Sequence, residues 1–458
     1  MNTAEKRIVV VANRLPVRRV EGSTEWETSP GGLVSSLTPF LQDRDGCWVG
    51  WAGVADEEIE NFSHDGIEQR PVPISAEEME NYYYGFCNGT IWPLYHDAVR
   101  TPEFHRHWWG PYEEVNRRFA REAAWSVNPD DIAWVQDYQL QLVPGYLREQ
   151  RPDVTIGFYL HIPFPPVELF AQLPWRTQII EGILGADVIA FQTASGLANF
   201  ARAAQRFTSA RRRGKVLEYG DRTIKLQRAP IAIDTGHFAA LAESPLAVAR
   251  AEALRREVHD CKVLLGVDRL DYTKGIDIRL RAFETLLERN PGRENEFVFI
   301  QVAVPSREGV GEYTEMRNRI EQIVGHINGR FGHPGHVPVH YLYRNLPQDE
   351  LVAYYLLADV MAVTPLRDGM NLVAKEYVAT RKDNTGVLLL SEFTGAAESL
   401  SQALLVNPHD VDGLSGALAQ AVDLPEADMK KRMVALRRYV KRHDIYDWAR
   451  KCLGELGA

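Results

Sequence analysis

The sequence predicts an α/β protein built on buried parallel sheets. Short apolar runs rich in β-branched residues recur along the chain, and longer stretches with helical patterns separate them. Such alternation is typical of strands that are buried on both faces of a doubly wound sheet. Charged or strongly polar residues follow most of these runs. Because ligands of open α/β sheets bind outside the carboxyl ends of the strands, these residues are candidates for a site.

Strands are expected where an apolar run is bounded by polar or turn-forming residues. In chain order these runs are Ile8–Val11, Ile132–Val135, Thr155–Leu160, Val188–Phe191, Val263–Val267, Phe297–Val302, Val339–Tyr343, Val360–Val363 and Val387–Leu390. A helix rich in Ala, Glu and Arg is expected within residues 238–258, and a fresh strand follows it. This break predicts one α/β domain over residues 1–240 and another over residues 241–440, with a ligand-binding cleft between them.

The composition is that of an ordinary globular protein. The 458 residues are 45% hydrophobic and 25% charged, and the net charge of −10 argues against nucleic acid as a partner. The four cysteines form no CxxC pair, so neither a metal site nor a disulfide framework is indicated. Since no run has the length of a signal peptide or membrane span, we expect a cytoplasmic protein with no membrane partner.

The segment from Arg367 to Glu376 is the most informative part of the chain. It follows a strand and a Thr-Pro break, and a helical pattern begins at about Leu372. Free backbone amides and the positive end of the helix dipole would meet there, which suits a phosphate. Glu376 is expected in the first helical turn, where its carboxylate could accept hydrogen bonds from two ribose hydroxyls. The segment therefore predicts half of a nucleotide-sugar site.

Basic residues after other strands provide candidate anion sites. Arg269 and Lys274 lie across a strand-to-helix turn, where both could converge on one diphosphate and stabilise its departure. Arg14 and Arg307 are separate groups that could hold a second anion, such as a sugar phosphate. The Gly31-Gly32 turn could bring backbone close to a phosphate.

Aromatic residues in the first half of the chain indicate a sugar-binding site. Trp51, Tyr83 and Trp92 belong to aromatic clusters in the first predicted domain. Apolar ring faces stack on pyranoses, while Tyr hydroxyls and Trp N–H groups bond to sugar oxygens.

Several motifs together resemble one known family, the retaining glycosyltransferases of family 20 that make trehalose 6-phosphate. They occur in the family's order over nearly all of the chain. The motifs are Ala12-Asn13-Arg14, Gly31-Gly32-Leu33, Gly50-Trp51-Ala52-Gly53, Trp92-Pro93-Leu94, Asp137-Tyr138, His161-Ile162-Pro163-Phe164-Pro165, the run from Asp268 to Gly275, His326-Ile327-Asn328-Gly329 and the run from Thr364 to Glu376.

The resemblance implies a GT-B fold, in which two Rossmann-like domains face each other across a deep cleft. A last helix around residues 444–456, within a segment 441–458, would cross back to the first domain. The implied reaction moves glucose from a nucleoside-diphosphate glucose to glucose 6-phosphate with retention, without a cofactor or a metal. The chain carries no evident phosphatase domain, so the phosphate should stay on the product. By analogy with the family, the protein would be a homo-oligomer, either a dimer or a tetramer.

The resemblance also assigns residues to the two substrates. The residues implied for the acceptor are Arg14, Trp51, Tyr83, Trp92, Asp137 and Arg307. Those implied for the donor are Gly32, His161, Arg269, Lys274, Asp368, Gly369, Met370, Asn371, Leu372 and Glu376. Catalytic contributions are expected from Arg269, Lys274, Asp137, His161 and Asp368. Asp137 and Asp368 are the only obvious candidates for a carboxylate nucleophile, and neither is assigned that role.

The chain departs from the family pattern at one motif and leaves one question open. It has Gln136-Asp137-Tyr138-Gln139 where the family has His-Asp-Tyr-His. The aspartate remains, so activity is still expected without the flanking imidazoles. Arg344 could bond to or stack on a purine, or it could be a surface arginine. UDP-, GDP- and ADP-glucose therefore all remain possible donors.

Three other readings compete with this one. A metal-dependent glycosyltransferase would need a DxD motif, and Asp43-Arg44-Asp45 and Asp410-Val411-Asp412 fit that pattern without following any of the strands above. A related enzyme of the same fold could use a cyclitol substrate. A non-catalytic sensor of sugar phosphates would be expected to lose the diphosphate pair, but Arg269 and Lys274 are both present.

Overall fold

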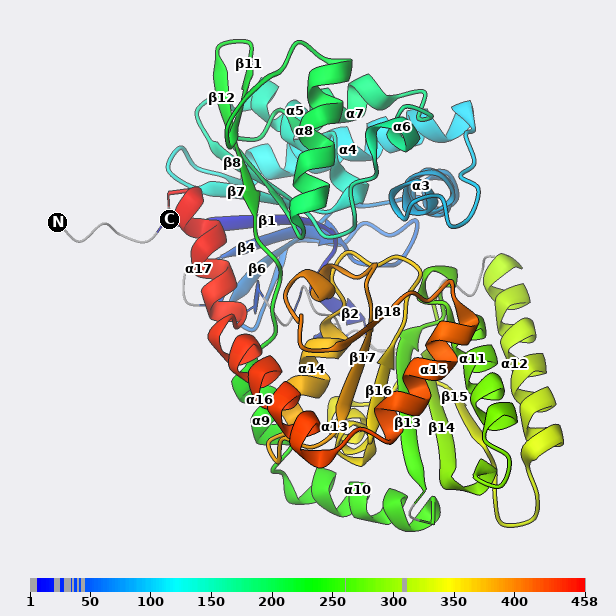
Figure 1. The fold of residues 1–458 in the computed structure, drawn as a ribbon. Helices are drawn as coiled ribbons and strands as arrows, with labels where there is room; N and C mark the ends of the chain where they lie inside the picture. The colour runs from blue at the N-terminus through cyan, green and yellow to red at the C-terminus, as the bar shows by residue number, and fades with distance from the viewer. Residues whose placement is uncertain are drawn as a thin grey trace. The chain divides into compact units, whose positions relative to one another are not determined.

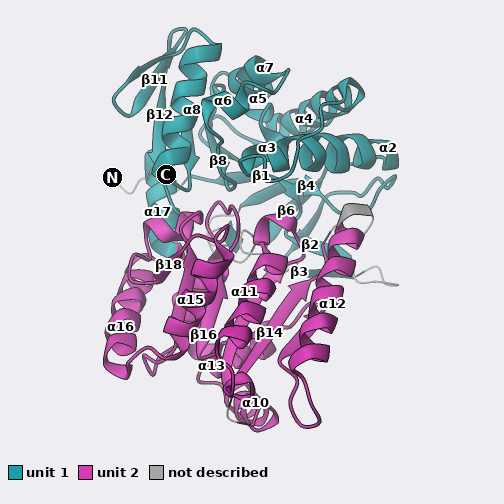
Figure 2. Cartoon of the chain, turned by 45° about the vertical axis from the view of Figure 1, so that its right-hand side comes forward, with its two compact units in different colours: residues 1–231, 446–458 teal, residues 232–445 magenta. Residues whose placement is uncertain are grey.

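The chain forms two compact units, residues 1–231 with 446–458, and residues 232–445 (Figures 1 and 2). The computed structural model describes residues 6–19, 25–28, 34, 37–38, 41–42, 46–259, 261–306 and 311–457. Every apolar run predicted as a strand lies within a strand of one of the two main sheets.

The first unit is built on a sheet of ten strands in the order β10-β11-β12-β9-β8-β7-β1-β4-β6-β5. From β12 to β6 the neighbours are parallel, and antiparallel strands complete both edges. The strands are β1 (Ile8–Arg14), β4 (Cys47–Trp51), β5 (Phe62–His64), β6 (Ile67–Pro71), β7 (Ile132–Gln136), β8 (Thr155–Leu160), β9 (Val188–Phe191), β10 (Arg211–Arg213), β11 (Val216–Tyr219) and β12 (Arg222–Arg228), beside a hairpin of β2 (Val17–Arg19) and β3 (Trp26–Thr28).

Helices connect the strands of this unit, and the last helix of the chain packs on them. They are α2 (Ala76–Glu78), the π-helix η1 (Met79–Ile91), α3 (Trp92–Tyr95), α4 (Arg106–Ser126), η2 (Tyr138–Leu140), α5 (Val143–Gln150), α6 (Val167–Phe170), α7 (Arg176–Ile183), α8 (Ala194–Phe207) and α17 (Ile445–Glu455). Trp448 of α17 stacks on Trp134 of β7, with 5.5 Å between ring centroids, and its indole N–H donates to the Ala229 carbonyl (3.1 Å). The helix α17, red in Figure 1, therefore belongs to the first unit from Tyr446 onward.

The second unit has a six-stranded, fully parallel sheet in the order β15-β14-β13-β16-β17-β18. The strands are β13 (Lys262–Arg269), β14 (Phe297–Val304), β15 (Val339–Tyr343), β16 (Val360–Val363), β17 (Val387–Ser391) and β18 (Leu404–Val406). The helices are α9 (Thr235–Leu241), α10 (Pro245–Glu257), η3 (Tyr272–Lys274), α11 (Ile276–Arg289), η4 (Glu294–Glu296), α12 (Gly311–Phe331), α13 (Gln348–Leu357), α14 (Leu372–Thr380), η5 (Gly395–Glu398), α15 (Val411–Val422) and α16 (Glu426–Arg442).

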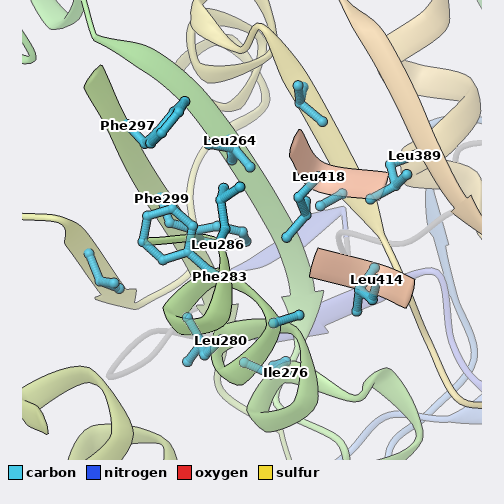
Figure 3. Close-up of a cluster of buried hydrophobic side chains, with 14 of the residues drawn as sticks. Leu264, Ile276, Leu280, Phe283, Leu286, Phe297, Phe299, Leu389, Leu414 and Leu418 are labelled. Carbon is cyan, nitrogen blue, oxygen red and sulfur yellow. The ribbon is translucent and has the colours of Figure 1, made fainter. Parts of the chain in front are cut away.

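The core of the second unit fixes α11 against the sheet. Phe283 and Leu286 on α11 point toward Leu264 of β13 and Phe299 of β14 (Figure 3), and the two phenylalanine rings are 5.3 Å apart. Apolar residues recur on one face of α11 because a helix at a sheet surface must bury a stripe of side chains. This packing holds the turn between β13 and α11, where Lys274 lies.

Some strands have no counterpart among the predicted runs. In β4 all five residues are buried, yet its two tryptophans are predicted only as part of an aromatic cluster. The strand β12 alternates polar and apolar residues, and β18 is short. Within the part of the chain that the structure describes, no helix is long and apolar enough to cross a membrane.

Candidate functional site

Arg14 lies at the end of β1, with its guanidinium over an aromatic ring. Its guanidinium carbon is 4.0 Å from the ring centroid of Trp51 and 6.0 Å from that of Tyr83. The Trp51 indole is fixed by its N–H, which donates to the Val54 carbonyl at 2.7 Å. Burial lowers the pKa of Arg14, and within the described residues no carboxylate pairs with it. A stacked cation without an acidic partner is suited to bind an anion.

Two glycines explain why the chain can place Arg14 there. A Cβ atom on Gly53 would lie 1.9 Å from Arg14 Nη1, and Gly53 has a φ of +92°. A Cβ atom on Gly50 would lie 2.7 Å from the backbone nitrogen of Leu15. The Gly50-Trp51-Ala52-Gly53 motif therefore supplies both the aromatic platform and the space for the guanidinium.

The carboxyl ends of β7 and β8 bring Asp137 and His161 together. These strands are parallel neighbours, with Gln136 opposite Tyr159. The Asp137 carboxylate accepts the backbone N–H of His161 at 3.1 Å, and Gln136 Oε1 lies 2.9 Å from His161 Nε2. Asp137 has a φ of +72°, an uncommon conformation for a residue with a side chain. Burial lowers the pKa of His161 to about 3, so the imidazole is neutral near pH 7.

Trp92 begins α3 and lies close to the same strand end. Its ring centroid is 5.6 Å from that of Tyr138, which follows Asp137 directly. Trp92 is 5% exposed, so the indole is mostly enclosed. The first sheet thus carries two clusters at its carboxyl edge, one around Arg14 and one around Asp137.

In the second unit, Lys274 and Asp368 form an ion pair. Lys274 Nζ lies 2.6 Å from Asp368 Oδ2, and their side chains are 11% and 13% exposed. Beneath them the buried Arg279 pairs with Asp268 at 2.5 Å and donates to the Lys274 carbonyl at 3.3 Å. Arg269 is the last residue of β13 and is exposed. The end of β13 and the turn after it therefore carry the cations Arg269 and Lys274, and the buried Arg279–Asp268 pair holds the backbone beside them.

Asp368 organises the loop that precedes α14. Its carboxylate accepts the Met370 N–H at 3.3 Å and the Asn371 side-chain amide at 3.2 Å. Asn371 has a φ of +79° and caps the helix, because its side-chain oxygen accepts the Ala374 N–H at 3.1 Å. The helix begins at Leu372, where the predicted helical pattern begins. The other first amides of α14 have no acceptor within the helix and can serve a ligand.

The prediction that Glu376 lies in the first turn of this helix is wrong. The first turn holds no acidic residue, because the Asn371 cap sets the helix start at Leu372 and puts Glu376 one turn further on. Glu376 Oε2 accepts a hydrogen bond of 2.8 Å from the Tyr355 hydroxyl. Burial raises the pKa of Glu376 to about 7, against the smaller lowering effect of the Tyr355 hydrogen bond.

Some predicted residues fall outside the described part of the chain. These are Gly32, Arg307 and the triplet Asp43-Arg44-Asp45. The other DxD triplet has structural roles: Asp410 caps α15 by accepting the Gly413 N–H, and Asp412 pairs with Arg289. Among the described residues no group of His, Cys, Asp and Glu side chains could hold a metal ion.

Arg344 behaves as a surface residue in this structure. It is 55% exposed and pairs with Glu350 at 3.3 Å.

Sequence reasoning missed several residues that support the site. The sequence around Tyr355 does not mark it as a site residue, because the apolar residues of α13 are typical of a helix packed in the core. Gly53 belongs to the Gly50-Trp51-Ala52-Gly53 motif, but its closeness to Arg14 depends on the pairing of β1 with β4, which the motif does not reveal. Arg279 is a buried charge, and such a charge needs a partner that the sequence alone cannot name.

Comparisons with known proteins identify the family of the chain. The model of "Glycosyltransferase family 20" matches residues 6–458. The trehalose-6-phosphate synthase of Mycolicibacterium smegmatis is 53% identical over 463 residues, which cover 98% of this chain and 92% of that protein. That of Mycobacterium avium is 51% identical over 465 residues, covering 98% and 94%.

Solved structures are similar over the whole fold. An α,α-trehalose-phosphate synthase (UDP-forming) of Burkholderia xenovorans in complex with glucose-6-phosphate has a TM-score of 0.91 and 32% identity, covering 99% of this chain and 100% of that one. A trehalose-6-phosphate structure from E. coli, bound with UDP-2-fluoro glucose, has a TM-score of 0.91 and 33% identity, covering 98% and 99%. These matches confirm the GT-B class of α/β fold. The chain belongs to glycosyltransferase family 20.

Proposed function

We propose that the protein transfers glucose from a nucleoside-diphosphate glucose to glucose 6-phosphate with retention, giving α,α-trehalose 6-phosphate and a nucleoside diphosphate. One observation carries the proposal: a chain of this family holds a stacked cation, Arg14, on one sheet and the Lys274–Asp368 pair on the other. The names of the mycobacterial relatives and the ligands of the two solved structures support the same reaction.

The first domain, residues 1–240, would bind the acceptor. Arg14 and Arg307 would hold its phosphate with the help of Tyr83 and Trp92. Trp51 and Asp137 would line the sugar. The stacking of Arg14 on Trp51 supports this assignment, because the cation lies at the edge where ligands of such sheets bind and no carboxylate of the described residues pairs with it.

The second domain, residues 241–440, would bind the donor. Arg269 and Lys274 would hold the diphosphate, and Glu376 the ribose. Asp368 and the backbone of residues 369–372 would face the donor sugar, which the loop contacts of Asp368 support. Gly32 and His161 would complete the donor site from the first domain. The final segment, 441–458, would return to that domain, as the grouping of residues 446–458 with residues 1–231 supports.

The chemistry follows from charge placement. The bond between the anomeric carbon and the diphosphate oxygen breaks early, so the ring gains oxocarbenium character while Arg269 and Lys274 stabilise the leaving charge. The anomeric hydroxyl of the acceptor attacks from the same face, and a diphosphate oxygen takes its proton. The phosphate on the acceptor is untouched and stays on the product.

A carboxylate nucleophile is not needed in this scheme. A double displacement would require one beside the anomeric carbon. The Asp137 carboxylate holds the His161 backbone, and the Asp368 carboxylate holds Lys274 and the loop. Both carboxylates are therefore suited to hold neighbouring groups in place. Such positioning can account for a large part of the lowering of the activation barrier.

We further propose that the protein is a cytoplasmic homo-oligomer, either a dimer or a tetramer. The four buried cysteines, which are free thiols, support a reducing compartment. The oligomer rests on family analogy alone. Light scattering after gel filtration would test it, and a monomer at micromolar concentration would contradict it.

A donor panel tests the proposed reaction. UDP-, GDP- and ADP-glucose are each incubated with glucose 6-phosphate, and release of nucleoside diphosphate is measured. Arg269→Ala and Lys274→Ala should lower kcat by about 100- to 1000-fold, the range for losing one transition-state donor. Arg307→Ala should mainly raise the KM for glucose 6-phosphate.

Arg289→Ala, which removes an exposed cation paired with Asp412, is the control for the loss of a charge. It should leave these constants unchanged. Kinetics like those of the wild type in all three site variants would refute the assignment of the site.

A further inference from the structure

Gln136 links a fixed carbonyl to the ring of His161. Its side-chain nitrogen donates to the Trp134 carbonyl at 3.3 Å, and its side-chain oxygen lies 2.9 Å from His161 Nε2. Gln136 is fully buried, so water does not compete for either contact. The parallel register of β7 and β8 sets this geometry, since it holds Gln136 opposite Tyr159, two residues before the histidine.

The Trp134 carbonyl determines which way the Gln136 amide points. A carbonyl oxygen only accepts hydrogen bonds, so the amide must turn its NH₂ group toward Trp134. Its oxygen then faces His161, and this oxygen too can only accept. His161 Nε2 must therefore carry a proton. A neutral imidazole has one ring proton, so Nδ1 carries a lone pair.

We propose that Gln136 is a positioning residue that fixes His161 as the Nε2–H tautomer, so that Nδ1 acts only as an acceptor for a hydroxyl of the donor sugar. The role of the acceptor atom rests on the proposed function, in which His161 contacts the donor. Within the described residues no other group hydrogen-bonds to the His161 ring, and Tyr159 contacts its face at 4.4 Å between centroids.

The groups around His161 keep it neutral. Burial lowers its pKa to about 3. Among the described residues, the acid that hydrogen-bonds to His161 is Asp137, and its carboxylate accepts the backbone N–H of His161. The pKa of Tyr159 is raised well above its usual value by burial, so this phenol is also uncharged. The lone pair on Nδ1 is thus available throughout the range from pH 5 to 8.

The departure from the family pattern at position 136 now has a physical meaning. A histidine at that position can donate or accept and can change its own charge with pH. A glutamine whose NH₂ group is held by a carbonyl presents only an acceptor to His161 and has no charge to change. The substitution therefore removes tautomer exchange and titration from beside His161.

Nitrogen NMR of histidine-labelled protein measures the tautomer directly. The His161 signals are assigned by their loss in His161→Asn. We expect Nδ1 to have the shift of an unprotonated ring nitrogen and Nε2 that of a protonated one, unchanged from pH 6 to 8. A protonated Nδ1 would overturn the proposal. This readout does not require activity, so it stands even if no transfer to glucose 6-phosphate is found.

Gln136→Glu tests the positioning role through the pH profile. A carboxylate beside Nε2 favours the doubly protonated ring, which cannot accept at Nδ1. The KM for the donor should then rise at low pH and recover as the pH increases, while the KM for glucose 6-phosphate stays constant. Gln136→Met, of similar size, should weaken donor use at every pH.

Gln139→Glu is the matched control, because it makes the same change in the same motif, and among the described hydrogen bonds the His161 ring is paired with Gln136 and not with Gln139. It should keep the wild-type profile. A wild-type profile in Gln136→Glu as well would overturn the proposal. If that variant does not fold, the NMR shifts of the wild-type protein still decide the tautomer.

Discussion

Replacing Gly53 by alanine should weaken acceptor binding while leaving the fold intact. The new Cβ atom would lie 1.9 Å from Arg14 Nη1, where ordinary contact begins at 3.4 Å. The guanidinium must therefore move by roughly 1.5 Å, which displaces it from its stacked position over Trp51. The clash involves the end of a flexible side chain, so the backbone need not shift.

The size of the effect follows from what Arg14 would lose. A hydrogen bond to a charged group contributes about 1.5–3 kcal/mol. Since 1.4 kcal/mol corresponds to a factor of ten, the KM for glucose 6-phosphate should rise by about 10- to 100-fold. The positive φ of Gly53 adds a strain of about 1–2 kcal/mol to the folded state of the alanine variant.

Gly66→Ala separates the clash from the strain. Gly66 has a φ of +77°, but nothing lies within 4 Å of the point that a Cβ atom would occupy, so this variant has the strain without the displacement of Arg14. Initial rates against glucose 6-phosphate, together with urea unfolding, are measured for both variants. Equal KM values in the two would refute the reasoning, as would a Gly53→Ala variant that loses stability far beyond Gly66→Ala.

Three further outcomes are expected from the second unit. Lys274→Met should lower kcat for nucleoside diphosphate release by about 100-fold or more while changing the KM for glucose 6-phosphate little. Glu376 has a pKa of about 7, so its carboxylate is protonated below that pH, and the donor KM should fall as pH rises from 6 to 8. Tyr355→Phe, which removes a hydrogen bond that lowers this pKa, should move the transition to higher pH, and an unchanged profile would contradict this. Arg279→Met should destabilise the fold by about 3–5 kcal/mol in urea, because it leaves Asp268 buried without its partner. Arg289→Met, at the exposed end of the same helix, should cost less than about 1 kcal/mol, and equal losses would refute the distinction.

The buried parallel strands could be predicted from the sequence, because a run of apolar residues is a local pattern. The strands β8, β9, β15 and β16 have the predicted bounds, since each run is rich in apolar and β-branched residues and a polar residue follows it directly. Edge and mixed strands such as β12 give a weaker signal, because one face is solvated and charged residues interrupt the run.

The sequence predicted which strands end in residues that could bind a substrate, but not how those residues contact one another. Contacts across strands could not be predicted, because they depend on register: Gln136 reaches His161 only through the pairing of β7 with β8. The turn that holds Glu376 depends on the positive φ of Asn371, which propensity does not reveal. The space beside Arg14 depends on Gly53, which is distant in sequence.

The most direct test of the central claim is the structure of the reaction product. The protein is incubated with glucose 6-phosphate and the most active donor of the panel, and the product is examined by proton, carbon and phosphorus NMR. The proposal predicts a 1,1-linked disaccharide with two α-anomeric signals and one phosphate at position 6. A β-anomeric signal, a linkage through another hydroxyl or release of inorganic phosphate would contradict it.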